Sequence, residues 1–465
     1  MIPGTAIPFD RELIRKYDRP GPRYTSYPTA PQFRDDFGSA DYSQLLLESR
    51  RDDGGGALPL SVYLHLPFCE TRCFFCGCNV IISRRRERAL DYLPVLDREM
   101  AAVAELAGAA GRETVQVHWG GGTPTFLPPE EITRLMAAVR RRFPLADDCE
   151  IGVEVDPRRL TEAHLDALAD AGVNRLSMGV QDLDARVQEA VNRVQPPEET
   201  WAVLEGARRR GMTSVNVDLI YGLPHQTPAS FAATVDEVIE RAPDRLAVFN
   251  FAYLPEMFPH QRVIAPEALP GPEEKLTMLE GTIERLTGAG YVLIGMDHFA
   301  RPEDPLARAL EDRTLTRNFQ GYSTCGRTDL VAFGVSSISH VAGGFAQNVK
   351  DLGDYEEAVA AGRLPVYRGL APTREDRLRR DVILGIMGHF HLDKDAVEAA
   401  HGIDFDRHFA AELEALEPLA ADGLVALRPR SLEVTPLGRL LVRNVAMVFD
   451  EYLPRGAGAR YSRTV

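Results

Sequence analysis

Strand-like runs alternate with amphipathic helical runs from about residue 58, and this alternation constrains the fold more than any other feature of the chain. It is typical of parallel βα units joined by right-handed crossovers. About six such units are present, fewer than the eight of a closed barrel, so we predict an α/β fold with a partial (βα)6-type barrel. The predicted strands are Leu60–Leu66, Thr114–Trp119, Glu150–Val155, Arg175–Gly179, Ser214–Ile220 and Leu246–Ala252, and the predicted helices are Ala89–Leu106, Pro129–Arg142, Glu162–Ala171, Glu198–Arg210 and Pro228–Arg241.

The segments on either side of the barrel have a different character. Pro20, Pro22 and Pro28 disfavour helix and central strand, so residues 1–57 are predicted to be an irregular extension. Its first thirty residues are locally basic, so we expect it to cover the site and handle an anionic ligand; a solvated tail is the alternative. Beyond residue 372, helical runs and a short hairpin predict a small, mostly helical domain. The helical runs are Glu375–Met387, Lys394–His401, Phe405–Leu413 and a last helix opened by Pro436. The predicted division is an N-terminal extension (1–57), a partial barrel (58–300), a barrel extension (301–371) and a helical C-terminal domain (372–465).

The charge balance limits the partners of the chain. There are 68 acidic residues against 53 lysines and arginines, a net charge of −15. A chain this acidic is not expected to bind nucleic acid or an anionic membrane. The sequence has no apolar run long enough to span a bilayer, and its first residues lack the features of a signal peptide. We therefore expect a cytoplasmic protein and, since nothing suggests a strong dimer surface, a monomer.

Four of the six cysteines fall within ten residues: Cys69, Cys73, Cys76 and Cys78. So dense a cluster predicts a metal site and not a disulfide framework. The CxxxCxxC spacing of the first three, on one short loop, favours a four-iron cluster with one open iron, because soft thiolates suit iron in such clusters. Cys78 would then lie near the cluster without binding it. Zinc held by all four thiolates is the alternative.

Glycine and polar residues stand where several predicted strands end. The run Gly120–Gly122, followed by Thr123, offers backbone groups that a nucleotide or amino acid can approach closely. In parallel α/β proteins this edge of the sheet is where ligands bind. The polar residues at or just beyond strand ends are Glu154, Asp156, Gln181, Arg193 and Asp218.

These polar residues have different chemical uses. The planar guanidinium of Arg193 suits a ligand carboxylate, and Asp218 suits ribose hydroxyls. Tyr63 and His65 alternate with apolar neighbours, so both are expected to point into the barrel. The alternative for the strand-end residues is a loop held by caps or salt bridges, and for Tyr63 a place in the core.

Together these motifs resemble the oxygen-independent coproporphyrinogen III oxidase family of radical S-adenosylmethionine (SAM) enzymes. The CxxxCxxC spacing, with Phe75 before its last cysteine, marks the superfamily, while Cys78 and the N-terminal motif mark the family. The resemblance runs from about residue 15 to the C-terminus. The other motifs are Gly21-Pro-Arg-Tyr-Thr-Ser-Tyr-Pro28, His118-Trp-Gly-Gly-Gly-Thr-Pro-Thr125, Ser177-Met-Gly-Val-Gln181, Asn216-Val-Asp-Leu-Ile-Tyr-Gly-Leu-Pro224 and Asn318-Phe-Gln-Gly-Tyr322.

The resemblance implies a radical SAM barrel, a 4Fe-4S cluster and two SAM molecules. It assigns the cluster to Cys69, Cys73 and Cys76, and it makes Tyr63 and Cys78 the expected catalytic residues. The residues implied for the SAM bound to the cluster are Tyr63, Gly121, Glu154 and Ile338. Those implied for the second SAM are Phe75, Gly77, Gly122, Thr123, Gln181, Arg193, Asp218 and Ala252.

The implied reaction converts two propionates of coproporphyrinogen III to vinyl groups, giving protoporphyrinogen IX in haem biosynthesis. A 5′-deoxyadenosyl radical would start each event, and an unidentified electron donor would reduce the cluster. The substrate carries four carboxylates, so a local cationic patch is expected, with Arg19 and Arg23 as candidates. A haem chaperone and another two-SAM radical enzyme are the alternatives within this fold. The sequence departs from the family at Tyr253, where the family has histidine, and at Cys325 and Arg327.

Overall fold

The computed structural model describes residues 7–50, 56–453, 461 and 463–464. These residues form two compact units. The barrel unit consists of Phe33–Gly271 and Arg327–Ala371. The second unit combines the described residues of Met1–Gln32, Pro272–Gly326 and Pro372–Val465. Residues 1–6 and 51–55 of the predicted N-terminal extension lie outside the described part, and the predicted four-segment division stays a prediction.

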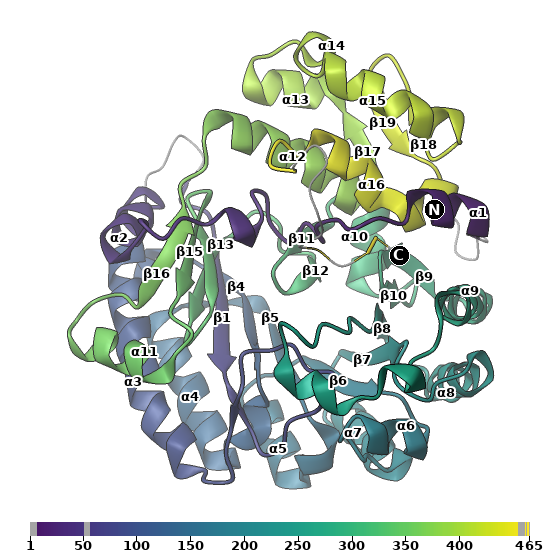
Figure 1. Cartoon of the computed structure of the whole chain (residues 1–465). Coiled ribbons are helices and arrows are strands. Elements are labelled where there is room, and N and C mark those ends of the chain that lie inside the picture. Colours follow the sequence, from purple (N-terminus) through teal and green to yellow (C-terminus); the bar gives the residue numbers. More distant parts are fainter. Residues whose placement is uncertain (1–6, 51–55, 454–460, 462, 465) are drawn as a thin grey trace. The chain divides into compact units, whose positions relative to one another are not determined.

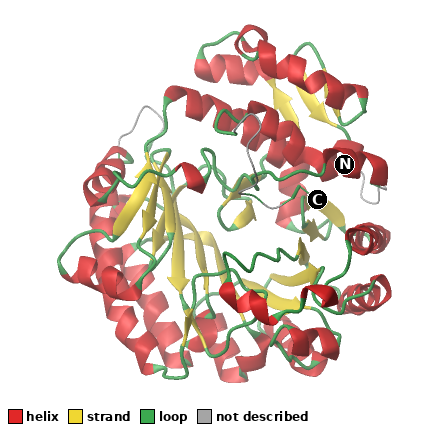
Figure 2. Ribbon diagram, in the orientation of Figure 1, coloured by secondary structure: helices red, strands yellow, loops and turns green. Residues whose placement is uncertain are grey.

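The barrel unit is built on one large sheet with helices packed along it (Figures 1 and 2). Its strands are β1 (Leu60–Leu66), β2 (Phe68–Cys69), β3 (Ile81–Ile82), β4 (Thr114–Gly121), β5 (Leu145–Val155), β6 (Arg175–Gln181), β7 (Ser214–Tyr221), β8 (Arg245–Asn250), β13 (Asp329–Phe333), β14 (Ile338–Val341), β15 (Gly344–Asn348) and β16 (Val366–Leu370). Its helices are α2 (Ser39–Glu48), α3 (Glu87–Ala107), α4 (Pro129–Arg142), α5 (Glu162–Asp170), α6 (Ala185–Ala190), α7 (Pro197–Arg209), α8 (Pro228–Arg241) and α11 (Leu352–Ala360).

The order of strands in the large sheet confirms the predicted partial barrel. Within the barrel unit the order is β16-β15-β14-β13-β1-β4-β5-β6-β7-β8. From β13 to β8 neighbouring strands run parallel, and β14, β15 and β16 add an antiparallel extension. Helices α3, α4, α5, α7 and α8 cover the outer face of the parallel part (Figure 1). The carboxyl ends of the parallel strands therefore meet at one edge, as the sequence predicted.

Local sequence explains where these elements begin and end. Helix α4 opens with Pro129, whose fixed φ suits the first turn, and closes with three arginines that favour a helix C-terminus. Strand β1 is buried almost throughout, and its even-numbered Leu60, Val62, Leu64 and Leu66 are fully buried apolar residues. Tyr63 and His65 therefore share the opposite, barrel-facing side of β1, which confirms the expectation for these two residues.

The second unit joins segments far apart in the chain. Its elements are α1 (Arg11–Tyr17), α9 (Pro272–Gly288), β9 (Val292–Gly295), β10 (His298–Ala300), α10 (Pro305–Glu311), β11 (Thr316–Asn318), β12 (Gly321–Ser323), α12 (Arg374–His389), β17 (His391–Asp393), α13 (Lys394–His401), α14 (Phe405–His408), α15 (Ala410–Ala421), β18 (Val425–Leu427), β19 (Ser431–Val434) and α16 (Val442–Ala446). One hydrophobic core unites most of these elements, and it includes Tyr24 and Tyr27 from the N-terminal extension. Among the described residues, we find no helix both long and apolar enough to traverse a lipid bilayer.

Three local expectations differ from the structure. The N-terminal extension is not wholly irregular, because Asp10 caps α1 with two backbone hydrogen bonds and α2 forms beyond the proline-rich stretch. The predicted helix Phe405–Leu413 is divided, since the fully buried Phe409 leaves helical geometry to pack edge-on against Phe449 at 5.3 Å. The predicted hairpin gains β17 as a third strand, and Leu437–Leu441 is a 3-10 turn before α16.

A buried carboxylate ties α3 to the antiparallel side of the sheet. Glu99 of α3 accepts hydrogen bonds from the Gly334 backbone N–H at 2.8 Å, from Asn348 Nδ2 at 2.6 Å and from the Tyr355 hydroxyl at 2.6 Å. Tyr92, also on α3, donates to the His65 carbonyl at 3.1 Å. Burial raises the pKa of Glu99 to about 7, against the effect of its three donors.

This raised pKa predicts a pH-dependent stability. The folded state favours protonated Glu99, so its contribution is complete below pH 4.5 and is lost as the pH rises to about 7. The loss amounts to at most about 3 kcal/mol of unfolding free energy. Glu99→Gln removes the titration, so the urea midpoint of the variant should fall less than that of the parent between pH 5 and pH 8. Parallel pH profiles for the two proteins would contradict the assignment.

Candidate active site

The cysteine loop is closed at its base by backbone hydrogen bonds. It runs from β2 to β3, which pair in parallel with Cys69 opposite Ile82. The Ser83 N–H donates to the Cys69 carbonyl at 2.9 Å. All four thiols of the loop are free: Cys73 is buried, Cys69 and Cys76 are half-buried, and Cys78 is exposed. The loop therefore presents several thiols from one short, anchored segment.

The glycine run at the end of β4 packs directly on this loop. The Gly122 and Thr123 N–H groups donate to the carbonyls of Leu66 and Phe68, both at 2.9 Å. A Cβ atom at Gly122 would lie 2.6 Å from the Pro67 carbonyl carbon, so only glycine permits this approach. Thr123 Oγ1 also lies 3.4 Å from Cys69 Sγ. The end of β4 and the cysteine loop thus form one backbone-linked structure.

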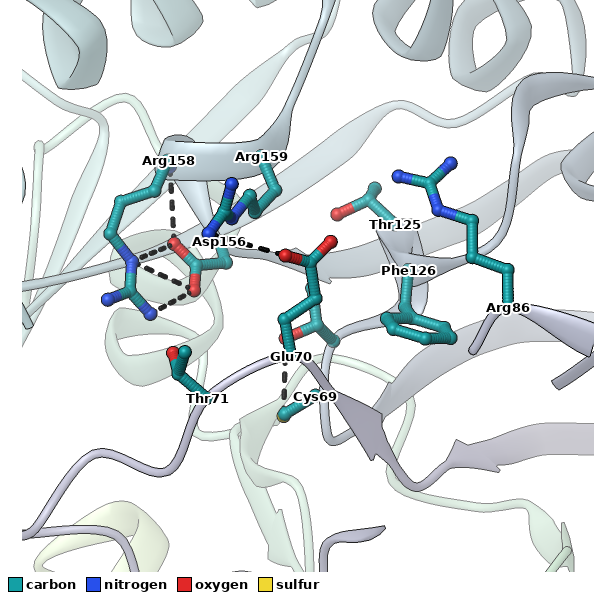
Figure 3. Close-up of a pocket in the computed structure, with 10 residues that line it drawn as sticks. Cys69, Glu70, Thr71, Arg86, Thr125, Phe126, Asp156, Arg158 and Arg159 are labelled. Atoms are coloured by element: carbon teal, nitrogen blue, oxygen red, sulfur yellow. Dashed lines mark hydrogen bonds and ion pairs between the residues drawn. The ribbon is translucent and has the colours of Figure 1, made fainter. Parts of the chain in front are cut away.

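Two arginines stand beside the buried Cys73. Its Sγ lies 3.6 Å from Arg193 Nη1 and 3.8 Å from Arg158 Nη2. Asp156 accepts three side-chain contacts from Arg158 (Figure 3) and lies 3.5 Å from Arg193 Nη1. Burial alone would raise the pKa of Asp156, but Arg193 and Arg158 outweigh it and lower that pKa to about 2. The two cations therefore share one carboxylate beside the Cys73 sulfur.

The thiols of the loop differ in how readily they ionise. Burial raises the pKa of Cys69 to about 11 in spite of its contact with Thr123. The Cys78 thiol donates to Cys76 and lowers the pKa of Cys76 to about 6, while the same contact raises the pKa of Cys78. Since a thiol loses its proton when it binds a metal, the lowered pKa of Cys76 suits it to act as a thiolate ligand.

A polar chain crosses the barrel interior from β1 to β5. The Tyr63 hydroxyl donates to His65 Nδ1 at 3.2 Å, and His65 Nε2 donates to the Asn79 carbonyl at 3.0 Å. Tyr63 stacks on His118, its register partner on β4, and His118 Nε2 lies 3.3 Å from Glu154 Oε1. Burial raises the pKa of Glu154, but His118 and the Gly121 N–H reverse this and hold it low. Glu154 is therefore an anion ready to meet a cationic ligand group.

The carboxyl group of Asp218 on β7 has a raised pKa, unlike that of Glu154. Burial raises its pKa to about 7, with Glu154 adding to the shift and Asn216 opposing it. Asn216 Nδ2 donates to Asp218 at 2.8 Å, and the Ser177 hydroxyl lies 3.5 Å from it. Near neutral pH this carboxyl group therefore exists in both protonation states, so it can accept from or donate to a neutral hydroxyl.

The remaining predicted site residues come from the cysteine loop, from the segment after β8 and from the start of β14. Phe75 packs on a small apolar cluster that includes Val187, Leu223 and Phe251. Gly77 faces the ring of Phe258, while Ala252 follows β8 and Ile338 opens β14 opposite Gln347. In the described residues, no three His, Cys, Asp or Glu side chains are gathered as a single metal ion would need.

Three contributing residues were not singled out from the sequence. His118 is the β4 neighbour of Tyr63, which strand alternation and register together would have indicated. Arg158 follows the Asp156 cap by two residues, a relation that only the folded turn reveals. His260 Nε2 donates to the Cys76 carbonyl at 2.7 Å from a loop 184 positions away, and no sequence pattern marks that contact.

Comparison with known proteins agrees with this geometry. Residues 63–238 match the Radical SAM superfamily model, and residues 373–441 match the HemN C-terminal domain model. The oxygen-independent coproporphyrinogen III oxidases of Pseudomonas aeruginosa and Escherichia coli K12 are 49% and 48% identical, each over 99% of both chains. The chain belongs to the oxygen-independent coproporphyrinogen III oxidase family. A solved structure of this family, HemN from Escherichia coli, shares 47% identity and covers 97% of this chain and 100% of its own, with a TM-score of 0.91.

Radical SAM members of this family use a 4Fe-4S cluster and SAM, and the residues present fit both groups. The cysteine loop supplies soft thiol donors, which suit iron in such clusters. Gln181 Oε1 and Arg193 Nε are buried and have no hydrogen-bond partner among the residues that the structure describes, as expected of groups that await a polar ligand. The glycines at the end of β4 leave backbone open beside them. The family's cofactors thus match unsatisfied features of this barrel.

The packing at Gly122 predicts a specific defect. Gly122→Ala forces a methyl group against the Pro67 and Phe68 backbone, which must shift and move Cys69. Overpacking of this kind costs about 1–3 kcal/mol. After anaerobic reconstitution we expect iron and sulfide per chain to fall at least about twofold, in line with that cost. Gly111→Ala is the matched control, because a Cβ atom there meets nothing within 4 Å. Equal iron contents in the two variants would contradict the packing argument.

Proposed function

We propose that the chain catalyses the oxygen-independent oxidative decarboxylation of coproporphyrinogen III to protoporphyrinogen IX. Two propionates become vinyl groups, each with loss of carbon dioxide, one hydrogen atom and one electron. The observation that carries the proposal is the identity of 48–49% with family members over 99% of both chains, with the cysteine loop and its glycine partner intact. Members share both the barrel and the C-terminal domain with this chain.

The proposed roles follow the chemistry of each side chain. Cys69, Cys73 and Cys76 would hold the cluster, which together with SAM supplies the radical that removes hydrogen from the propionate β-carbon. Anionic Glu154 would receive the ammonium group of the first SAM, next to Tyr63, Gly121 and Ile338. Arg193 would take the carboxylate of the second SAM through its planar guanidinium. Asp218 would bind ribose hydroxyls in a second-SAM site completed by Phe75, Gly77, Gly122, Thr123, Gln181 and Ala252.

The barrel also has to exclude water from the reacting groups. Tyr63, His118 and Glu154 are linked across its interior, and burial raises the pKa of Tyr63 well above its usual range. Tyr63 therefore stays a neutral phenol that holds its proton on the His65 side. We place Tyr63 and Cys78 beside the reacting centre as the catalytic residues. The further expectations of an external electron donor, no nucleic acid, a monomer and a cytoplasmic location belong to the same proposal.

A turnover experiment tests the proposal directly. The reconstituted protein, SAM, a reductant and coproporphyrinogen III are incubated without oxygen, and the products are identified by mass spectrometry. Protoporphyrinogen IX with 5′-deoxyadenosine supports the proposal. 5′-Deoxyadenosine without a decarboxylated porphyrin would indicate a radical SAM enzyme that acts on another substrate. Tight haem binding without either product would favour a haem chaperone.

Cysteine substitutions distinguish a ligand of the cluster from a cysteine that does not bind it. Cys73→Ser should abolish turnover and most of the visible absorbance of the cluster, because serine is a poor ligand for iron–sulfur centres. Cys325→Ser, at a half-buried cysteine outside the cysteine loop, should keep both turnover and cluster absorbance within about twofold. Full cluster absorbance in the Cys73 variant would show that Cys73 is not a ligand of the cluster.

Arg23 offers a test of substrate binding. It pairs with Asp297 in the second unit, and its backbone carbonyl accepts from Arg317 at 3.2 Å, which fixes the segment. If the guanidinium also meets a propionate, Arg23→Ala should lower kcat/KM about tenfold while cluster content stays the same, as loss of one charged hydrogen bond implies. Arg15→Ala, which removes a more exposed arginine paired with Glu273, is the matched control. Equal kcat/KM values for both variants would exclude Arg23 from the substrate site.

A further inference from the structure

A run of arginines lies directly beyond the cysteine loop. Arg84, Arg85, Arg86 and Arg88 are interrupted only by Glu87, and the first three are exposed. Within the described part of the chain, the guanidinium groups of Arg84, Arg85 and Arg86 have no ion pair or hydrogen bond. Three exposed arginines with one acidic neighbour, Glu87, leave an excess of positive charge, so their presence in a chain of net charge −15 calls for a partner that supplies further anions.

The arginine run is anchored to the cysteine loop itself. Ile82 of β3 lies opposite Cys69, and Ser83 donates its N–H to the Cys69 carbonyl at 2.9 Å. The run therefore begins one residue after that hydrogen bond. Ile82 is also one of the exposed large apolar residues, with 38% of its surface accessible.

A small cavity connects this surface to the proposed cluster ligands (Figure 3). It has a volume of about 20 Å³, and its wall includes Arg86, Arg159 and Cys69. Arg159 Nη2 lies 3.3 Å from Glu70 Oε2 (Figure 3). We call Ile82, Arg84, Arg85, Arg86 and Arg159 the basic patch. It combines an exposed apolar residue with an excess of positive charge, as a docking site does, although Glu70 pairs with Arg159 and Glu87 lies within the arginine run.

We propose that the basic patch is the docking surface for the electron donor, and that this donor is a small acidic protein that carries single electrons. The inference rests on the proposed function, because reduction of the cluster takes an electron from outside the chain. The carrier is oxidised by one electron and the cluster is reduced by one, and no bond forms or breaks between the proteins. Charge complementarity steers the carrier to the part of the surface that leads to Cys69, where the path for the electron is short.

Reduced flavodoxin, an acidic flavoprotein, serves as the probe, and dithionite serves as the small reductant that needs no docking. The double variant Arg84→Glu/Arg85→Glu changes the charge of the patch, whereas Arg407→Glu/Arg428→Glu makes the same change at exposed arginines of the second unit. We expect the patch variant to raise the Kd for oxidised flavodoxin about tenfold at low salt and the control to raise it less than about twofold. The Arg84→Gln/Arg85→Gln variant should fall between the two.

Reduction of the cluster, followed by its visible absorbance, gives a second readout. With flavodoxin, the cluster of the patch variant should be reduced more slowly than that of the parent, and its reduction rate should depend less on salt. With dithionite, the two proteins should have equal reduction rates. Equal Kd values for the patch and control variants would overturn the proposal, as would equal slowing with both reductants. Binding of RNA instead of flavodoxin by the unsubstituted patch would also overturn it. Failure of porphyrinogen turnover with a fully reduced cluster would refute the proposed function but leave the binding result standing.

Discussion

The close approach between the end of β4 and the cysteine loop underlies the whole candidate site. Two backbone N–H groups, from Gly122 and Thr123, reach carbonyls on the strand that leads into the loop. On the other side, β3 closes the loop through its pairing with β2. The thiols are therefore positioned by main-chain hydrogen bonds, which tolerate little displacement, and not by the packing of flexible side chains. Precise placement matters here because radical chemistry depends on the distance between reacting groups.

Electrostatics within the barrel complements this frame. Although the protein is acidic overall, Arg158 and Arg193 lie next to Cys73, the most buried cysteine of the loop. A single carboxylate, Asp156, pairs with both arginines. Across the interior, Glu154 stays ionised while Asp218 lies near its titration point. A charged acceptor on β5 and a titrating one on β7, with β6 between them, thus suit different polar groups of a ligand.

Much of this arrangement could be predicted from the sequence, because hydrophobic periodicity and the carboxyl-edge rule act locally. The helices Pro129–Arg142 and Pro228–Arg241 have the predicted bounds, and the polar residues gather at the predicted edge. The predictions that were wrong failed because tertiary contacts override the local pattern. The burial of Phe409 interrupts a helix that propensity alone would continue, and β17 forms only because β19 is there to pair with it. The link from Glu99 to Asn348 joins residues 249 positions apart, for which no spacing rule exists.

The discontinuous barrel unit has a consequence for how the protein is made. Strand β1 pairs on one side with β4, but its other neighbour, β13, lies beyond the whole of the second unit's middle segment. During synthesis, one edge of β1 therefore waits for Asp329–Phe333 to emerge. An open strand of apolar residues is a template for unwanted pairing, and contacts this distant in sequence form slowly. Until these residues emerge, the nascent chain exposes an unpaired apolar strand edge, which makes aggregation during synthesis a hazard for this topology.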